Sequence, residues 1–494
     1  MLVPYVLLQT ILVPLVAAPI VALLGTKAGK HTGWIVAAIL SYTTFLLVLT
    51  GVALWNGMGQ IEEEYVWSTA VFNLKLGFKA DGLSLPVAFV MNLVCAASAV
   101  YSVRYMEHRI EQLYGKANRT MYAVYYSMYL LFSIGLVGVA LSTNLIELYV
   151  FVELVLIPSY FMIDLFGYVD RHRIAIMYFI WNHIGAALFL IGVVLAFSGN
   201  GGSFDVTALS KISGTSLGFW VCLLILLGWL VKMATFGFHV WLPYAHGEHP
   251  TSIAAIIATI VGLGNYVIVR LLFGQMPASF QVFGMPLMIL ALITMIYGAL
   301  LTMAQDDVKR LYACSTISQT AYSLLGIGSL TTFGVAGGVF YFLSHTLGKC
   351  ILFSIAGILI TQTGVRDMKQ MGGLARKMPL TATLCILGSM ILAGVPPLSG
   401  FQAEWIMFVG IFQKGQAFSW NLAIAIIGIF TIVLTTVYTF WPMIRIFFGQ
   451  IPEHLENVKE APLSMTLPLL VLAIVSFILG VFPNLVMRFL QSVI

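Results

Sequence analysis

Long apolar stretches are the feature of this sequence that most constrains its fold. A bilayer crossing needs roughly 20 mostly apolar residues, and about fourteen such stretches occur. They begin near residues 2, 33, 81, 121, 145, 173, 217, 251, 280, 311, 334, 379, 418 and 465. Because lipid offers the backbone no hydrogen-bond partner, stretches of this length must be helical. We therefore predict an all-α membrane protein, a single polytopic domain over residues 1–494 with about fourteen transmembrane helices.

Composition supports this class. The chain is 60% hydrophobic and 9% charged, whereas soluble domains carry about 25% charged residues. The first stretch, Leu2–Leu24, lacks a basic flank and is too long for a signal peptide, so we interpret it as a span. Basic residues gather in loops after odd-numbered spans, as at Lys27 and Arg366, and are sparse after even-numbered spans. By the positive-inside rule, both termini should lie outside the cytoplasm.

The sequence predicts no cofactor, metal or nucleic-acid site. Its five cysteines lie within apolar segments, far from any CxxC spacing, and read as small buried hydrophobes. It has no GxGxxG or Walker motif for a nucleotide, and a net charge of +5 needs no nucleic acid to explain it. His239, His246 and His249 in HVWLPYAHGEHP superficially suggest a metal site, but beyond Glu248 no carboxylate or cysteine cluster accompanies them. We favour an interfacial or proton-uptake role for these histidines.

Charged residues inside the apolar stretches are the functional candidates, because a charge at bilayer depth costs a few kcal/mol. Four stand out: Glu153, Lys232, Lys349 and Glu404. His345 lies one helical turn before Lys349 on the same face. A purely structural ion pair between Glu153 and Lys232 is the alternative for those two residues.

Two other charged residues receive little functional weight. Glu147 lies near a helix end and is expected to be interfacial. Arg270 is expected to reach the membrane surface by extending its side chain.

Helix-breaking residues accompany the candidate charges. Pro158 should kink the fifth span beside Glu153. Gly237 and Pro243 follow Lys232, and the sequence GVPPLSG precedes Glu404. We therefore predict that the seventh and twelfth spans are discontinuous, one in each half of the chain, which is typical of transporters built from repeats.

The residue types suit proton transfer. The pKa of a buried lysine responds readily to its surroundings, whereas arginine stays charged. A nearby carboxylate that gains or loses a proton can therefore control whether the lysine holds or releases its own. A series of such groups across the centre of the protein is expected to form a proton relay.

Four segments give the chain a specific resemblance. They are LVKMATFGFHVWLPYAHGEHPTS, QDDVKRLYACSTISQ, VRDMKQMGGLARKMP and GVPPLSGFQAEW. They resemble the antiporter-like subunits of complex I and of Mrp-type antiporters, over most of the chain. Glutamate at Glu404 and the sequence RDMKQMGGLARKMP resemble the chain M type (chain 4 in mitochondria), which includes the archaeal F(420)H(2) dehydrogenase chain M.

The resemblance implies a fold and roles for the candidate residues. Spans 1–3 would occupy residues 1–103, and two inverted five-helix repeats would cover spans 4–8 (121–273) and 9–13 (280–447). A last span would follow at 465–487. Glu153 and Lys232 would form the uptake pair, and Glu404 would end the exit half-channel.

Two positions depart from the family pattern. The usual lysine of the eighth span is replaced by Gly262, so we expect Lys349 to serve as the central carrier. Gln319 replaces a histidine of the tenth span, which leaves His345 as the favoured histidine bridge. These departures and the GEHP variant indicate a divergent relative in the cell membrane of a prokaryote.

We interpret the chain as a proton-translocating membrane subunit of a complex I-like respiratory oxidoreductase. NADH, F(420)H(2) or ferredoxin would be oxidised by partner subunits, and this chain would hold no redox cofactor. Its partners would be other membrane-arm subunits, including other antiporter-like chains, together with the lipid bilayer. One alternative is an Mrp-type cation/proton antiporter subunit, which Glu404 disfavours. Another is a structural spacer that moves nothing, which would gain nothing from buried lysines.

Overall fold

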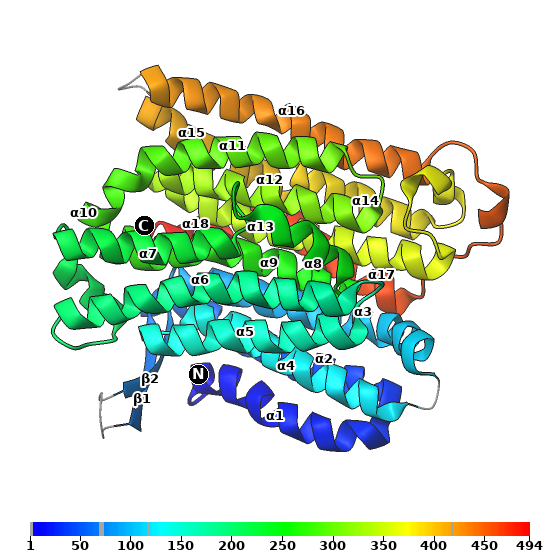
Figure 1. Ribbon diagram of the computed structural model, residues 1–494, viewed down its shortest axis with the longest axis horizontal. Coiled ribbons are helices and arrows are strands. Elements are labelled where there is room, and N and C mark those ends of the chain that lie inside the picture. The colour runs from blue at the N-terminus through cyan, green and yellow to red at the C-terminus, as the bar shows by residue number, and fades with distance from the viewer. Residues whose placement is uncertain (1–2, 69–73, 116–117, 416–418) are drawn as a thin grey trace.

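The computed structural model describes residues 3–68, 74–115, 118–415 and 419–494. The beginnings predicted near residues 2 and 418 lie outside these described residues. Long helices run roughly parallel to one another, and a small hairpin projects at one end (Figure 1). The helices are α1 Val6–Ala28, α2 Thr32–Ala53, α3 Ser84–Tyr114, α4 Arg119–Leu141, α5 Leu145–Phe166, α6 Arg171–Gly199, α7 Ser216–Lys232, α8 Leu242–Glu248, α9 Thr251–Val267, α10 Pro277–Phe280, α11 Gly284–Met303, α12 Val308–Gly328, α13 Thr332–Thr363, α14 Pro379–Leu392, α15 Ser399–Gly415, α16 Ser419–Phe447, α17 Leu463–Val481 and α18 Asn484–Leu490.

The apolar stretches are helical, as lipid requires of them. Within the described residues, ten helical segments are long and apolar enough to cross a membrane. The first of these joins α1 and α2 over 53 residues, from Val6 to Met58. The chain is therefore a multi-pass membrane protein.

A two-stranded hairpin departs from the all-α prediction. Strands β1 (Ile61–Ser68) and β2 (Leu74–Ala80) pair antiparallel, with Ile61 opposite Ala80. LKLGFKA alternates apolar and polar residues, and the residues from Ile61 to Val66 alternate between partly buried and exposed, which is the period-2 pattern of a strand with one covered face. Both strands are too short to span lipid, so the length of apolar runs did not predict them.

Two apolar helices stop part way, where interruptions were predicted. Helix α7 ends at Lys232, and the chain resumes regular α-helix at Leu242 in α8. Helix α14 ends at Leu392, and α15 begins at Ser399. The breaks contain Gly237 and Gly394, whose positive φ angles of 92° and 60° suit glycine. Each break lies next to a candidate charged residue.

Helices α9 and α13 form the centre of the molecule. The most apolar 18-residue windows of these two segments are 100% and 94% buried, against 39% for α6 and α16. Helix α13 packs against α9, α12, α14 and α15, and it lies in the middle of the ribbon between the N-terminal and C-terminal helices (Figure 1). Lys349 and His345 therefore both lie on α13, one of these two most buried helices.

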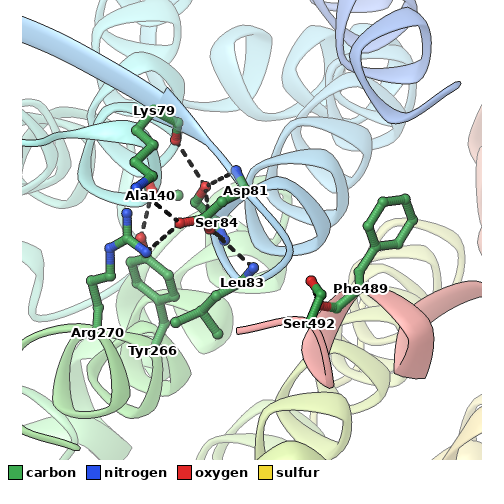
Figure 2. A network of polar contacts seen from close by, with 9 residues as sticks. All are labelled: Lys79, Asp81, Leu83, Ser84, Ala140, Tyr266, Arg270, Phe489 and Ser492. Carbon is green, nitrogen blue, oxygen red and sulfur yellow. Dashed lines mark hydrogen bonds and ion pairs between the residues drawn. The ribbon is translucent and has the colours of Figure 1, made fainter. Parts of the chain in front are cut away.

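An ion pair on the hairpin side joins the turn before α3 to the helical segment Ile268–Phe273 that continues α9. The Arg270 guanidinium lies 2.6 Å from Asp81 Oδ2, and both side chains are buried. Asp81 also accepts hydrogen bonds from the backbone N–H groups of Leu83 and Ser84 (Figure 2). The expectation that Arg270 reaches the membrane surface is therefore wrong, because a carboxylate lies within its reach inside the protein.

Candidate functional site

Glu153 lies on α5 and faces α6. Its Oε1 is 3.5 Å from Nδ1 of His183, and the two side chains are 16% and 49% exposed. The His183 ring stacks on Phe179 one turn earlier, with centroids 5.4 Å apart. His183 was not among the predicted site residues, because a single histidine in an apolar helix gives no motif. The structure identifies it as a titratable side chain beside Glu153, in addition to Tyr149 one turn earlier on α5.

Lys232, the last residue of α7, is 4% exposed. It lines a small cavity of about 10 Å³ together with Tyr178 and Asn182 of α6. That volume is close to the minimum for one water molecule. The described residues include no direct ion pair between Lys232 and Glu153. Any proton transfer between them therefore requires a bridging group or water, or a movement of the side chains.

Lys349 is fully buried on α13 and is bound by α12. Its ammonium donates a hydrogen bond to the Tyr312 carbonyl oxygen at 2.9 Å and another to the Ser315 hydroxyl. Ser315 is three residues from Tyr312, so both acceptors lie on adjacent turns of one helix face. The contact between Lys349 and α12 was not predicted. The sequence STISQ within α12 carries no charged residue that would indicate a partner for a lysine.

Two buried histidines lie near Lys349 without hydrogen-bond partners. Both ring nitrogens of His246 and of His345 lack a partner in the described part of the chain. His246 on α8 faces Phe353 of α13, with ring centroids 5.7 Å apart, and Phe353 is one turn beyond Lys349. Because buried polar groups are normally satisfied, these four nitrogens distinguish the two histidines from ordinary core side chains.

Two of the three histidines in HVWLPYAHGEHP have hydrogen-bond partners of their own. His239 hydrogen-bonds the Tyr297 hydroxyl at 3.1 Å, and His249 hydrogen-bonds Ser159 at 2.9 Å. No group of three or more His, Cys, Asp or Glu side chains gathers within the described ranges. Of the three histidines, only His246 faces the central lysine helix.

Gln319 on α12 forms hydrogen bonds to α13, α14 and α16. Its amide nitrogen donates to the Tyr438 hydroxyl at 2.6 Å, and its carbonyl oxygen accepts from the Tyr341 hydroxyl at 2.5 Å. The same nitrogen is 3.4 Å from the Leu392 carbonyl oxygen at the end of α14. Tyr341, His345 and Lys349 recur every fourth residue on α13, so they share a helix face. The glutamine that replaces a histidine therefore belongs to a polar seam between α12 and α13.

Glu404 lies in the first turns of α15 and is 5% exposed. Its Oε1 has no hydrogen-bond partner among the described residues. Its Oε2 lies where a Cβ on Gly394 would be, only 2.0 Å from that position. The break between α14 and α15 therefore gives the carboxylate its space, since any side chain at residue 394 would occupy it.

Lys309 anchors the discontinuous region from the opposite half of the chain. Its side chain is fully buried, and its Nζ donates to the carbonyl oxygens of Gly247 and His249, at 3.0 Å and 2.5 Å. Arg366 also reaches the Gly247 carbonyl oxygen, at 3.3 Å. These carbonyls lie at the C-terminal end of α8, where cations are favourable. Lys309 was not among the predicted site residues, because it lies just before an apolar stretch.

Glu147 is near a helix end, as expected, and it is buried there. Its side chain is 1% exposed, and Oε2 accepts a hydrogen bond from the Gly77 N–H of β2 at 3.2 Å. The hairpin covers this carboxylate, so its burial could not be predicted without the hairpin.

The chain is similar to a recognised family over most of its length. Residues 142–436 match the model described as NADH:quinone oxidoreductase/Mrp antiporter, TM, and residues 67–114 match the N-terminus of complex I chain 5. F(420)H(2) dehydrogenase subunit M of Methanosarcina mazei is 31% identical over 73% of this chain and 74% of that protein. NADH-quinone oxidoreductase subunit M of Rickettsia prowazekii is 27% identical over 96% and 95%.

Solved structures show the same fold. A chain of the Mrp complex from Dietzia superposes with a TM-score of 0.86 at 22% identity, covering 98% of this chain and 97% of that chain. The resemblance noted in the sequence is therefore confirmed.

Proposed function

Because this chain belongs to the NADH:quinone oxidoreductase/Mrp antiporter family of membrane subunits, we propose that it translocates protons as the M-type subunit of a respiratory oxidoreductase. Its relatives with sequence identity near 30% are named as subunits of F(420)H(2) dehydrogenase and NADH-quinone oxidoreductase. Electron transfer occurs in partner subunits, and this chain holds no redox cofactor.

The observation that carries the proposal is the series of buried ionisable groups across the bundle. Glu153, Lys232, Lys349 and Glu404 lie on four different long helices, and two of them border helix breaks. Ionisable groups at membrane depth cost free energy, so their presence indicates a role in transport. In this proposal, the unpartnered nitrogens of His246 and His345, together with the hydrogen bonds of Gln319, connect some of these ionisable groups to one another.

In this proposal a proton moves through four stages. It passes from His183 to the carboxylate of Glu153, and then through water to the amine of Lys232. Water beside His246 carries it to Lys349 and His345. The hydrogen-bonded seam of Tyr341, Gln319 and Tyr438 then leads toward Glu404, which releases it. At each stage one group gives up the proton that the next group accepts, and hydrogen-bond reach or a bridging water sets each step.

We also propose the finer architecture. The chain crosses the cell membrane of a prokaryote about fourteen times, with both termini outside the cytoplasm. Two inverted repeats cover 121–273 and 280–447. The matched interruptions between α7 and α8 and between α14 and α15 support this arrangement, because inverted repeats place discontinuous helices at corresponding positions.

Neighbouring antiporter-like subunits are the proposed partners on the face of α6. His183 lies mid-helix with half its side chain exposed, flanked by Ile180 and Ile184, which are 51% and 47% exposed. An imidazole facing lipid at that depth is unfavourable. A neighbouring subunit that covers this face supplies polar partners and a source of protons.

Reconstitution of the intact complex into vesicles tests the function. Electron transfer should acidify one side of the membrane, without sodium movement, and Glu404→Lys should impair this flux. Sodium transport coupled to the proton gradient in place of electron-driven proton flux would instead favour the Mrp-type antiporter, which the fold likeness alone supports.

A further inference from the structure

An apolar cavity lies away from the proton path. It has a volume of about 520 Å³ and is lined by residues of α2, α3, α17 and α18. Its lining includes Leu47, Gly51, Leu85, Phe89, Ile478 and Phe489. The volume falls within the roughly 300–1,000 Å³ of small-molecule sites. From Leu47 to Trp55 the lining follows α2 and its π-helical continuation for about 12 Å.

A polar cavity adjoins the apolar one. It has a volume of about 540 Å³ and is lined by Trp55, Asn484, Arg488, Gln491 and Ser492. Trp55 lines both cavities, so the two meet at this residue. The Arg488 guanidinium lies 4.2 Å from the centre of that ring and donates a hydrogen bond to the Trp55 carbonyl oxygen at 3.2 Å. A guanidinium has five N–H donors, so donors remain for an anion.

The wall between the two cavities is held in place. Helix α18 packs on the turn at Gly82, where an added Cβ would lie 2.1 Å from the Phe489 carbonyl oxygen. Hydrogen bonds from Ser84 and Leu83 to Asp81 fix the same turn, and Figure 2 shows Phe489 and Ser492 beside it. A cavity with a fixed wall costs its ligand little ordering on binding.

The apolar cavity borders the lipid-facing surface. Val48 and Val52 of α2 line it and are 42% and 53% exposed, and Ile478 of α17 is 41% exposed. Tryptophan and arginine side chains are typical of the level of lipid headgroups. An apolar channel with a cationic end at that level matches an acyl chain that carries an anionic headgroup.

We propose that these joined cavities bind one anionic phospholipid of the bilayer. An acyl chain fills the cavity beside Gly51, and the headgroup phosphate accepts hydrogen bonds from Arg488 beside the ring of Trp55. The charge of Arg488 favours this ligand over an apolar helix of a neighbouring subunit, because a helix would leave the cation without a counter-charge. The site does not depend on the proton relay.

Photolabelling of the intact complex tests the site. The complex is placed in phosphatidylcholine vesicles that contain either photoreactive phosphatidylglycerol or photoreactive phosphatidylcholine, and labelled peptides are identified by mass spectrometry. Peptides from α2 and α18 should take up the anionic probe about fivefold more than the zwitterionic one, as expected for one arginine near a headgroup.

Three variants make the result specific. Arg488→Gln should abolish the preference for the anionic probe. Gly51→Leu should reduce labelling by both probes, since a Cβ there meets only Leu85, at 3.7 Å, and a larger side chain fills the cavity. Arg445→Gln is the matched control, because Arg445 also lies over a tryptophan, Trp441 at 5.2 Å, outside the cavity.

Several results would overturn the proposal. These are equal labelling by the two probes, a preference that survives Arg488→Gln, or photocrosslinks that join α2 to another subunit. If Arg488→Gln prevents assembly, unchanged labelling in Gly51→Leu would overturn it by itself.

Discussion

The Nζ of Lys349 lies 2.9 Å from the Tyr312 carbonyl oxygen, so the central lysine of α13 is held by the backbone of α12. The Ser315 hydroxyl binds the same nitrogen. A lysine held by neutral acceptors can exchange its proton without breaking an ion pair. This geometry supports a carrier role for Lys349 in the absence of a lysine at Gly262.

Replacing Lys349 with methionine should lower electron-driven proton flux by about 100-fold or more, the scale of a lost proton-transfer group. The complex should still assemble, because replacing a buried charge with an apolar residue of similar size is often neutral for stability. Lys377→Met, at an exposed lysine, is the control and should pump normally. Normal flux in Lys349→Met would eliminate the proposed role.

Moving the lysine to position 262 requires a second change. A Cβ on Gly262 would lie 2.4 Å from the Phe342 ring, so Gly262→Lys alone should be poorly accommodated. Gly262→Lys with Phe342→Ala, in the Lys349→Met background, should restore part of the proton flux. Gly262→Met with Phe342→Ala is the control without a proton site, and equal flux in the two would contradict the prediction.

His183 and Glu153 should act as one unit. His183→Phe keeps the ring that stacks on Phe179 but removes the titratable nitrogen, so it should lower flux about as much as Glu153→Gln. The double variant should be no worse than either single one, because coupled residues are not additive. His172→Phe, which removes an exposed histidine 2.6 Å from Asp164, should leave flux unchanged. Additive losses in the double variant would show that the two residues act independently.

Gly394→Ala should displace the Glu404 carboxylate and reduce proton flux in an assembled complex. The substitution combines a positive φ of 60° with a Cβ only 2.0 Å from Glu404 Oε2. Gly364→Ala separates the two effects, because its φ is 73° and nothing lies within 4 Å of its added Cβ. Both variants should lose about 1–2 kcal/mol of stability to backbone strain. Similar flux in both would mean that the carboxylate position is unimportant.

Asp81 should make stability depend on pH in the acid range. Burial alone would raise its pKa, but Arg270 and the hydrogen bonds from Ser84 and Leu83 outweigh burial and hold the pKa below its ordinary value. The stabilisation is therefore complete above the unfolded pKa of about 3.9, and is lost as the pH falls through the lower folded pKa. Thermal unfolding of the purified complex should show this loss, and Asp81→Asn should remove it.

Asp81→Asn should also destabilise the protein at neutral pH by about 3–5 kcal/mol, because it leaves the Arg270 charge buried without a counter-charge. Glu64→Gln is the matched control. Glu64 pairs with Lys75 at 2.8 Å, but both side chains are nearly half exposed, so the change should cost at most about 1 kcal/mol. Equal effects of the two variants would contradict the prediction.

The sequence alone predicted a multi-pass helical membrane protein, the two interruptions and the family. Lipid makes each backbone hydrogen bond local to its own helix, so the length of an apolar run predicts a span without knowledge of its neighbours. Glycine and proline likewise interrupt a helix at their own positions. The breaks after Lys232 and before Glu404 could therefore be predicted from the sequence. The cost of a charge in lipid likewise marked Lys349 before its surroundings were known.

Tertiary structure decided which side chains meet. Asp81 and Arg270 are 189 residues apart, and Lys309 binds carbonyls that lie about 60 positions earlier in the chain. Such pairs depend on how helices rotate and pack, which the period of a single helix does not encode. His183 beside Glu153, and the hairpin over Glu147, became visible only when the helices were placed together, because their partners come from other elements of the fold.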